Sequence, residues 1–199
     1  MTIETERGRS YPLTFAAADG DIEVRPMTSA DAAAVLAFAR RLPAHDLLFL
    51  RRDISQPKVV AAWVDVEGKG AVTTLLAIRG GEVLGCATLV RDPLSWSRHV
   101  GEMRVIVEPA ARGKGLGQKL TQECFVLALQ FELEKMIAQM TIDQREAIAV
   151  FEGMGFRAEA LLQGHVKDRE GEKHDVVILS HDVAKFQSRL SAYGLNEAF

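Results

Sequence analysis

Cysteine is scarce in this chain. Its 199 residues include two, Cys86 and Cys124, and both lie in apolar stretches without C-x-x-C spacing or a neighbouring pair of histidines. A structural zinc site needs about four such ligands, and a disulfide framework needs more cysteines at regular spacing. The sequence therefore argues against both. We expect no metal, and we expect a reducing compartment, the cytoplasm by default.

Long apolar runs and an excess of basic residues are also missing. No segment approaches the roughly 18 uninterrupted apolar residues of a membrane span, and residues 1–20 hold no apolar core of signal-peptide length. The 24 Lys and Arg residues against 27 Asp and Glu give a net charge of −3, which provides no basic field for nucleic acid. We expect a soluble protein that binds neither membranes nor nucleic acid.

The length suits one buried core and is too short for several large domains. We expect a flexible tail at residues 1–20, one domain at residues 21–183, and a short helical tail at residues 184–199. Strand patterns occur at 21–26, 71–79, 82–90, 99–107, 136–140, 157–166 and 172–182, and helical patterns at 28–41, 44–66, 115–134 and 144–153.

The stretch from Val105 to Gln118 combines an apolar strand, a glycine-rich turn and the start of a helix. Alternating glycines let the backbone approach a ligand and direct several N–H groups at it, and the helix start adds the positive end of its dipole. Arg112 and Lys114 add charge, so the turn is a candidate anion site. It is not the dinucleotide fingerprint, which would need glycine at position 118.

Arg112-x-x-Gly115-x-Gly117 resembles the R/Q-x-x-G-x-G/A motif of the GNAT superfamily, the Gcn5-related N-acetyltransferases. In that family the loop holds the pyrophosphate of acetyl-CoA. The resemblance implies an α/β (α+β) fold, the GNAT fold, with a central mixed, mostly antiparallel sheet of six to seven strands flanked by helices. It covers about residues 22–183.

A second stretch, residues 144–156, is similar to the GNAT pattern N-x-x-A-x-x-x-Y-x-x-x-G-F. Ala147 and the final Gly-Phe match, Gln144 stands at the Asn position beside Asp143, and Phe151 stands at the Tyr position. Two motifs in this order are harder to obtain by chance than one. Together they imply a binding site for acetyl-CoA made of Val105, Ile106, Val107, Arg112, Gly113, Lys114, Gly115, Leu116, Gly117, Gln118, Asp143, Gln144, Ala147, Val150 and Phe151.

Acetyl transfer to an alkyl amine requires removal of a proton, because such amines have pKa values near ~10.4. Glu102 is the candidate base, since several GNAT relatives place a carboxylate on the strand that leads to the pantetheine-binding run. The alternative is a solvated strand carboxylate or an ion-pair partner of Arg104.

Phe151 cannot protonate the departing thiolate as the family's tyrosine does. A water or another group serves instead, with Tyr193 and His165 as weak candidates, or no acid is needed because a thiol is a tolerable leaving group. The five histidines lack metal-ligand spacing, and each is expected at the surface or on a strand rather than in catalysis.

The function implied is an N-acetyltransferase that moves the acetyl group from acetyl-CoA to a primary amine by direct attack in a ternary complex. The amine belongs to a small molecule, an amino acid or a protein. Residues 44–66 are expected to form one wall of the acceptor pocket, where Asp46, Asp53, Asp65 and Glu67 suit a cation or are simply solvated. The alternative is an acyl-CoA-binding or sensor module, and a homodimer fits either reading.

Overall fold

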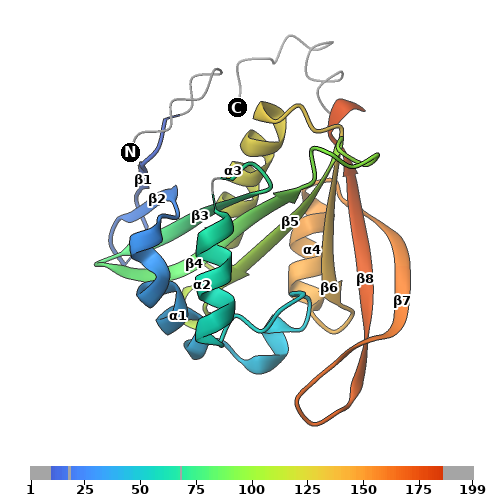
Figure 1. Cartoon of the computed structure of the whole chain (residues 1–199), viewed down its shortest axis with the longest axis horizontal. Helices are drawn as coiled ribbons and strands as arrows, with labels where there is room; N and C mark the ends of the chain where they lie inside the picture. Colours follow the sequence, from blue (N-terminus) through green and yellow to red (C-terminus); the bar gives the residue numbers. More distant parts are fainter. Residues whose placement is uncertain (1–9, 18, 68, 186–199) are drawn as a thin grey trace.

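The computed structural model describes residues 10–17, 19–67 and 69–185 (Figure 1). Eight strands, four α-helices and three short 3-10 helices follow one another within these residues. Their order is β1 (Leu13–Phe15), β2 (Ile22–Pro26), η1 (Ser29–Asp31), α1 (Ala32–Arg41), η2 (Ala44–Leu47), α2 (Pro57–Val66), β3 (Val72–Arg79), β4 (Glu82–Arg91), β5 (Val100–Val107), η3 (Pro109–Ala111), α3 (Leu116–Gln130), β6 (Lys135–Thr141), α4 (Arg145–Gly153), β7 (Arg157–Lys167) and β8 (Lys173–Asp182).

The strands form one sheet in the order β1-β2-β3-β4-β5-β6-β8-β7, which confirms the expected mixed, mostly antiparallel architecture. The turn between β3 and β4 consists of Gly80 and Gly81 with φ angles of 58° and 83°. Two consecutive residues with positive φ match the right-handed twist of a tight hairpin, so glycine is required there. In the described sheet only β5 and β6 run parallel, and α3 connects them.

Helices cover both faces of the sheet (Figure 1). Alternate strand residues supply two separate cores, because successive side chains on a strand point to opposite faces. Leu75 packs in the core beneath α3, together with Cys124, whereas Leu76 packs in the core beneath α1 and α2, together with Cys86. Each cysteine is therefore buried in a different layer of the molecule.

The eighth strand, β1, lies within the segment for which we expected little order. It pairs antiparallel with β2, from Leu13 opposite Val24 to Phe15 opposite Ile22. Tyr11 is buried just before it, and its hydroxyl donates a hydrogen bond of 3.0 Å to the buried Glu123 of α3. Burial of an aromatic ring and pairing of a buried carboxylate outweigh the tendency of chain termini to be poorly ordered, on which the expectation rests. The expected tail at 184–199 lies outside the described residues beyond Lys185.

The parallel pair β5–β6 is short. Pairing runs from Val100 opposite Lys135 to Met103 opposite Ala138 and then stops, although both strands continue. Beyond this point β5 pairs only with β4, and β6 pairs only with β8. The sheet therefore opens between β5 and β6 toward their carboxyl ends (Figure 1).

A buried carboxyl lies where α2 approaches the sheet. Oε1 of Glu67 accepts a hydrogen bond of 2.6 Å from the backbone N–H of Thr74, while Oε2 has no partner among the described residues. Burial raises the pKa of Glu67 to about 7, and the hydrogen bond from Thr74 offsets only part of that effect. Glu67 is thus a structural group and not a solvated carboxylate of an acceptor site.

Glu67 predicts a specific pH dependence of stability. Its pKa in the folded protein is about 7 against an ordinary value of 4.5, so the native state keeps a proton that the unfolded state loses between these pH values. Stability contributed by this proton is present below pH 4.5 and falls by about 3 kcal/mol as pH rises through 7. We expect Glu67→Gln to remove this loss, so that the variant is more stable than the wild type at pH 8.

Urea unfolding of both proteins at pH 5 and pH 8 measures the effect. Glu82→Gln, which makes the same change at an exposed position of β4, is the matched control and should follow the wild type. Parallel pH profiles for Glu67→Gln and the wild type would contradict the assignment.

Candidate active site

The opening between β5 and β6 is a cleft of about 720 Å³. Its walls come from β5, the β5–α3 loop, β6, α4 and η2. All the residues expected to bind acetyl-CoA line it except Lys114 and Leu116. The structure therefore brings the two sequence motifs, which lie on different elements, to opposite sides of one cavity.

The loop before α3 has open space beside two of its glycines. Gly113 and Gly115 have φ angles of 72° and 80°, and no atom beyond the glycine and its two chain neighbours lies within 4 Å of where a Cβ would stand at either position. Gly115 is the N-cap of the 15-residue helix α3. The first N–H groups of a helix have no intrahelical acceptor, and the dipole favours an anion beside them. The loop thus fits a pyrophosphate group.

The two basic residues of the loop face different ways. Arg112 lines the cleft, where its Nε donates to the carbonyl oxygen of Val107 at 3.0 Å and its Nη2 donates to Oδ2 of Asp46 at 2.6 Å. Lys114 instead pairs with Asp19, outside the cleft lining. Leu116 is buried in the core beneath α3. Of the two cations, Arg112 is the one placed to meet a ligand in the cleft.

The α4 wall begins at Asp143 and Gln144 and ends at Phe151. The Phe151 ring is buried, lines the cleft and packs against Phe156 with ring centroids 5.0 Å apart. A phenyl ring has no proton that it could donate to a departing thiolate. His165 is exposed on β7 and is not part of the cleft lining, and Tyr193 lies outside the described residues.

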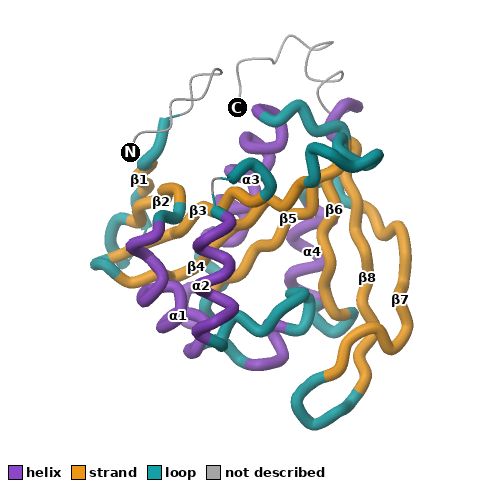
Figure 2. The backbone as a smooth tube through the Cα atoms, viewed as in Figure 1, coloured by secondary structure: helices purple, strands orange, loops and turns teal. Residues whose placement is uncertain are grey.

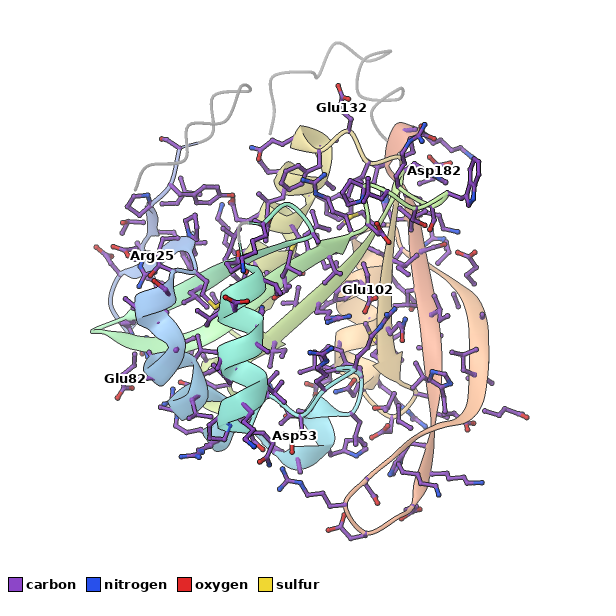
Figure 3. The ribbon with its side chains drawn as sticks, viewed as in Figure 1. Arg25, Asp53, Glu82, Glu102, Glu132 and Asp182 are labelled. Atoms are coloured by element: carbon purple, nitrogen blue, oxygen red, sulfur yellow. The ribbon has the colours of Figure 1, made fainter. Side chains whose placement is uncertain are left out.

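Glu102 lies one residue before the point where β5 and β6 part (Figure 3). Its carboxylate is buried, and it is not among the residues that line the cleft. Oε1 accepts a hydrogen bond of 2.8 Å from Nε of Arg104, and Oε2 accepts one of 3.0 Å from Nη2 of Arg51. The arrangement matches the ion-pair alternative with Arg104 and adds a second, largely exposed arginine from the connection before α2.

The expected pocket wall at residues 44–66 includes η2, which lines the cleft, but the sequence does not indicate the contacts that η2 makes there. His45 and Asp46 both line it, and Nε2 of His45 lies 2.5 Å from Oδ2 of Asp143. Burial raises the pKa of Asp143, and hydrogen bonds that include the one to His45 lower it by more, so the net shift is downward. The His45 ring also meets the edge of His174, with centroids 5.1 Å apart. No local pattern signals a contact between residues 98 positions apart.

Other lining residues are not among those that the two motifs assign to acetyl-CoA. They are Phe49 of the connection before α2, Thr121 of α3, Arg145 and Glu146 of α4, and the strand residues Met103, Ala138, Gln139 and Met140. In the described part of the chain, no helix has both the length and the apolar character that crossing a membrane requires.

Comparison with known proteins agrees with this architecture. Residues 38–156, more than half of the chain, match the model of the acetyltransferase (GNAT) family. The Bacillus subtilis (strain 168) protein YwnH, named as a phosphinothricin acetyltransferase, is 26% identical over 83 residues. That match covers 42% of this chain and 50% of YwnH, so the chain spans half the length of this relative.

Solved structures show the same fold. The ribosomal-protein-alanine N-acetyltransferase of Brucella melitensis superposes with a TM-score of 0.70 at 24% identity, covering 80% of this chain and 98% of that one. YncA of Salmonella typhimurium, solved with its cofactor acetyl-CoA, has a TM-score of 0.69 at 22% identity and covers 81% of this chain and 94% of its own. With the family model spanning both motifs and both walls of the cleft, the chain belongs to the GNAT family of acetyltransferases.

Proposed function

We propose that this protein transfers the acetyl group of acetyl-CoA to a primary amine by direct attack while both substrates are bound. The observation that carries the proposal is the glycine loop, which opens at a helix start onto the cleft between β5 and β6. A cytoplasmic location belongs to the same proposal, because both cysteines are free and buried, as suits a reducing compartment.

The cleft offers what coenzyme A needs. The β5–α3 loop supplies N–H groups and Arg112 for the pyrophosphate. From Arg104 to Val107, the edge of β5 that faces β6 has no strand partner in the described sheet, so its backbone groups are available to the pantetheine arm, apart from the carbonyl oxygen of Val107, which accepts a hydrogen bond from Arg112. Ala147, Val150 and Phe151 form an apolar wall opposite this edge. Acetyl-CoA supplies the thioester carbonyl, at which a C–N bond forms and the C–S bond breaks.

Glu102 is the proposed acceptor of the amine proton. It adjoins Met103, which lines the closed end of the cleft. Arg104 orients one carboxylate oxygen, and Arg51 covers the other. Because the Arg51 side chain is 71% exposed, it can move into water and leave Oε2 for an ammonium group.

The names of similar proteins supply amines to test: phosphinothricin, an N-terminal alanine peptide and spermidine. A second candidate function, binding of acyl-CoA without turnover, is favoured by Phe151, which cannot act as an acid. Release of CoA with any amine of this panel supports the transferase. Tight binding of acetyl-CoA without release on any amine supports the sensor.

The cofactor site is tested by the melting temperature with and without acetyl-CoA. A ligand at 100 times its Kd that binds only the folded state stabilises it by about 2.7 kcal/mol, so we expect a clear upward shift for the wild type. Arg112→Glu should lose the shift, because it places a negative charge in the anion site. Lys114→Glu makes the same charge reversal two residues away, outside the cleft, and should keep the shift.

Equal shifts for the wild type and Arg112→Glu would place the cofactor elsewhere. No shift for the wild type at millimolar acetyl-CoA would reject the proposed activity. Far-ultraviolet circular dichroism checks that each variant is folded.

A further inference from the structure

Residues 44–56, here called loop 44–56, are fastened to the rest of the protein by four side-chain contacts: a hydrogen bond between His45 and Asp143, and three ion pairs. Figure 2 shows the backbone of this connection between α1 and α2. Side chains along it pair with four different elements: the β6–α4 turn, the β5–α3 loop, β5 and the β7–β8 turn. The pairs are His45–Asp143 at 2.5 Å, Asp46–Arg112 at 2.6 Å, Arg51–Glu102 at 3.0 Å and Asp53–Arg169 at 3.1 Å.

Two of these pairs span the open end of the cleft. Neighbouring residues of η2 bind opposite walls, since His45 binds Asp143 on the α4 side and Asp46 binds Arg112 on the β5 side. The η2 helix thus connects the two walls of the cleft beyond the carboxyl ends of β5 and β6, where the two strands no longer pair. Asp53, labelled in Figure 3, accepts a hydrogen bond from Arg169 of the β7–β8 turn.

The Asp46–Arg112 pair places a carboxylate of the chain on the arginine of the proposed pyrophosphate site. One guanidinium has a limited set of N–H donors, and here Nε is used by Val107 and Nη2 by Asp46. A pyrophosphate oxygen carries the same charge and accepts the same short hydrogen bonds as a carboxylate oxygen. The side chains of Arg112 and Asp46 are 43% and 17% exposed, so the pair is open to exchange with an incoming anion.

We propose that Asp46 is an internal competitor for the cofactor's anion site, and that acetyl-CoA displaces it from Arg112 and so loosens loop 44–56. The inference rests on the proposed function. Its consequence for the reaction is an order of events, because loop 44–56 also carries Arg51, which covers Glu102. The bound cofactor releases the loop, and the released loop uncovers the carboxylate that accepts the amine's proton.

The proposal predicts that acetyl-CoA binds more tightly when the negative charge of Asp46 is removed. A ligand that must first break an ion pair binds with lower apparent affinity, and removing the pair restores the affinity. We expect Asp46→Asn to bind acetyl-CoA about two- to fivefold more tightly than the wild type, as fits an ion pair open to solvent. Asp53→Asn makes the same change in the same loop without touching Arg112, and its Kd should equal that of the wild type.

Isothermal titration with acetyl-CoA measures the Kd values, and the rate of cleavage by trypsin measures how mobile loop 44–56 is. Cleavage after Arg51 and Arg52, followed by mass spectrometry, should accelerate several-fold when acetyl-CoA is added to the wild type. In Asp46→Asn it should be fast without cofactor. Asp46→Ser repeats the test should the Asn variant fold poorly.

An unchanged or weaker affinity in both Asp46 variants would overturn the proposal, since the pair would then be structural only. Slower cleavage on adding acetyl-CoA would also overturn it, because the cofactor would be closing the loop. These results leave the proposed function intact. Absence of any acetyl-CoA binding in the wild type would reject both, which separates the two failures.

Discussion

Glu102→Gln is expected to lower kcat by about 10²- to 10³-fold with whichever amine the panel identifies. A positioned general base contributes an effect of this order, and glutamine cannot accept the proton. Glutamine has nearly the same shape, and its amide oxygen can still accept a hydrogen bond from Arg104, so the strand should keep its structure. The Kd for acetyl-CoA should change little, because Glu102 lies outside the cleft lining.

Steady-state kinetics at saturating acetyl-CoA measure the change, with Kd determined separately by titration. Glu146→Gln is the matched control, since Glu146 is a carboxylate that lines the cleft from α4. If kcat of Glu102→Gln stays within threefold of the wild type, another group or a water removes the proton. In that case the ion pairs with Arg104 and Arg51 are the whole role of this carboxylate.

Phe156→Ala is expected to lower the free energy of unfolding by about 4 kcal/mol, as large aromatic deletions in cores do. Phe156 is fully buried, and its ring packs against Phe151 at 5.0 Å, Phe125 at 5.7 Å and His181 at 5.3 Å. These contacts hold α4 against α3 and β8. The variant should therefore also bind acetyl-CoA more weakly, because Phe151 forms part of the cleft wall.

Urea unfolding gives the stability change. Leu161→Ala on β7 removes an exposed apolar side chain and should cost less than about 0.5 kcal/mol. If Phe156→Ala loses less than about 1.5 kcal/mol of unfolding free energy, neighbouring side chains fill the space that the ring leaves, and the aromatic cluster does not hold α4 in place.

The sequence anticipates the elements whose signals are local. The glycine pair at 80–81 marks the β3–β4 hairpin, the proline at 109 marks the end of β5, and the glycine loop before residue 116 marks the start of α3. The two motifs are also recognised from local sequence. The structure brings them to one cleft, although neither motif by itself indicates that the other lies beside it. Here the family resemblance supplied what periodicity could not.

The features that were missed depend on contacts between distant residues. Strand β1 forms because Tyr11 reaches a carboxylate 112 residues away, which no window of sequence shows. The contacts of His45 with Asp143 and of Asp46 with Arg112 join residues 98 and 66 positions apart. A histidine or aspartate in an irregular segment has the same local appearance whether it is solvated or bound. Only the fold distinguishes these cases.

The two buried cysteines make the layers of this protein separately observable. Burial raises the pKa of the Cys86 thiol to about 12, and burial also raises the pKa of Cys124. A folded molecule therefore resists thiol-reactive dyes at both positions, since the thiolate is the reactive form. Cys86 reacts when the α1–α2 layer opens, and Cys124 reacts when the α3 layer opens. Labelling rates of the two thiols thus measure the opening free energies of the two faces in one experiment, without any introduced probe.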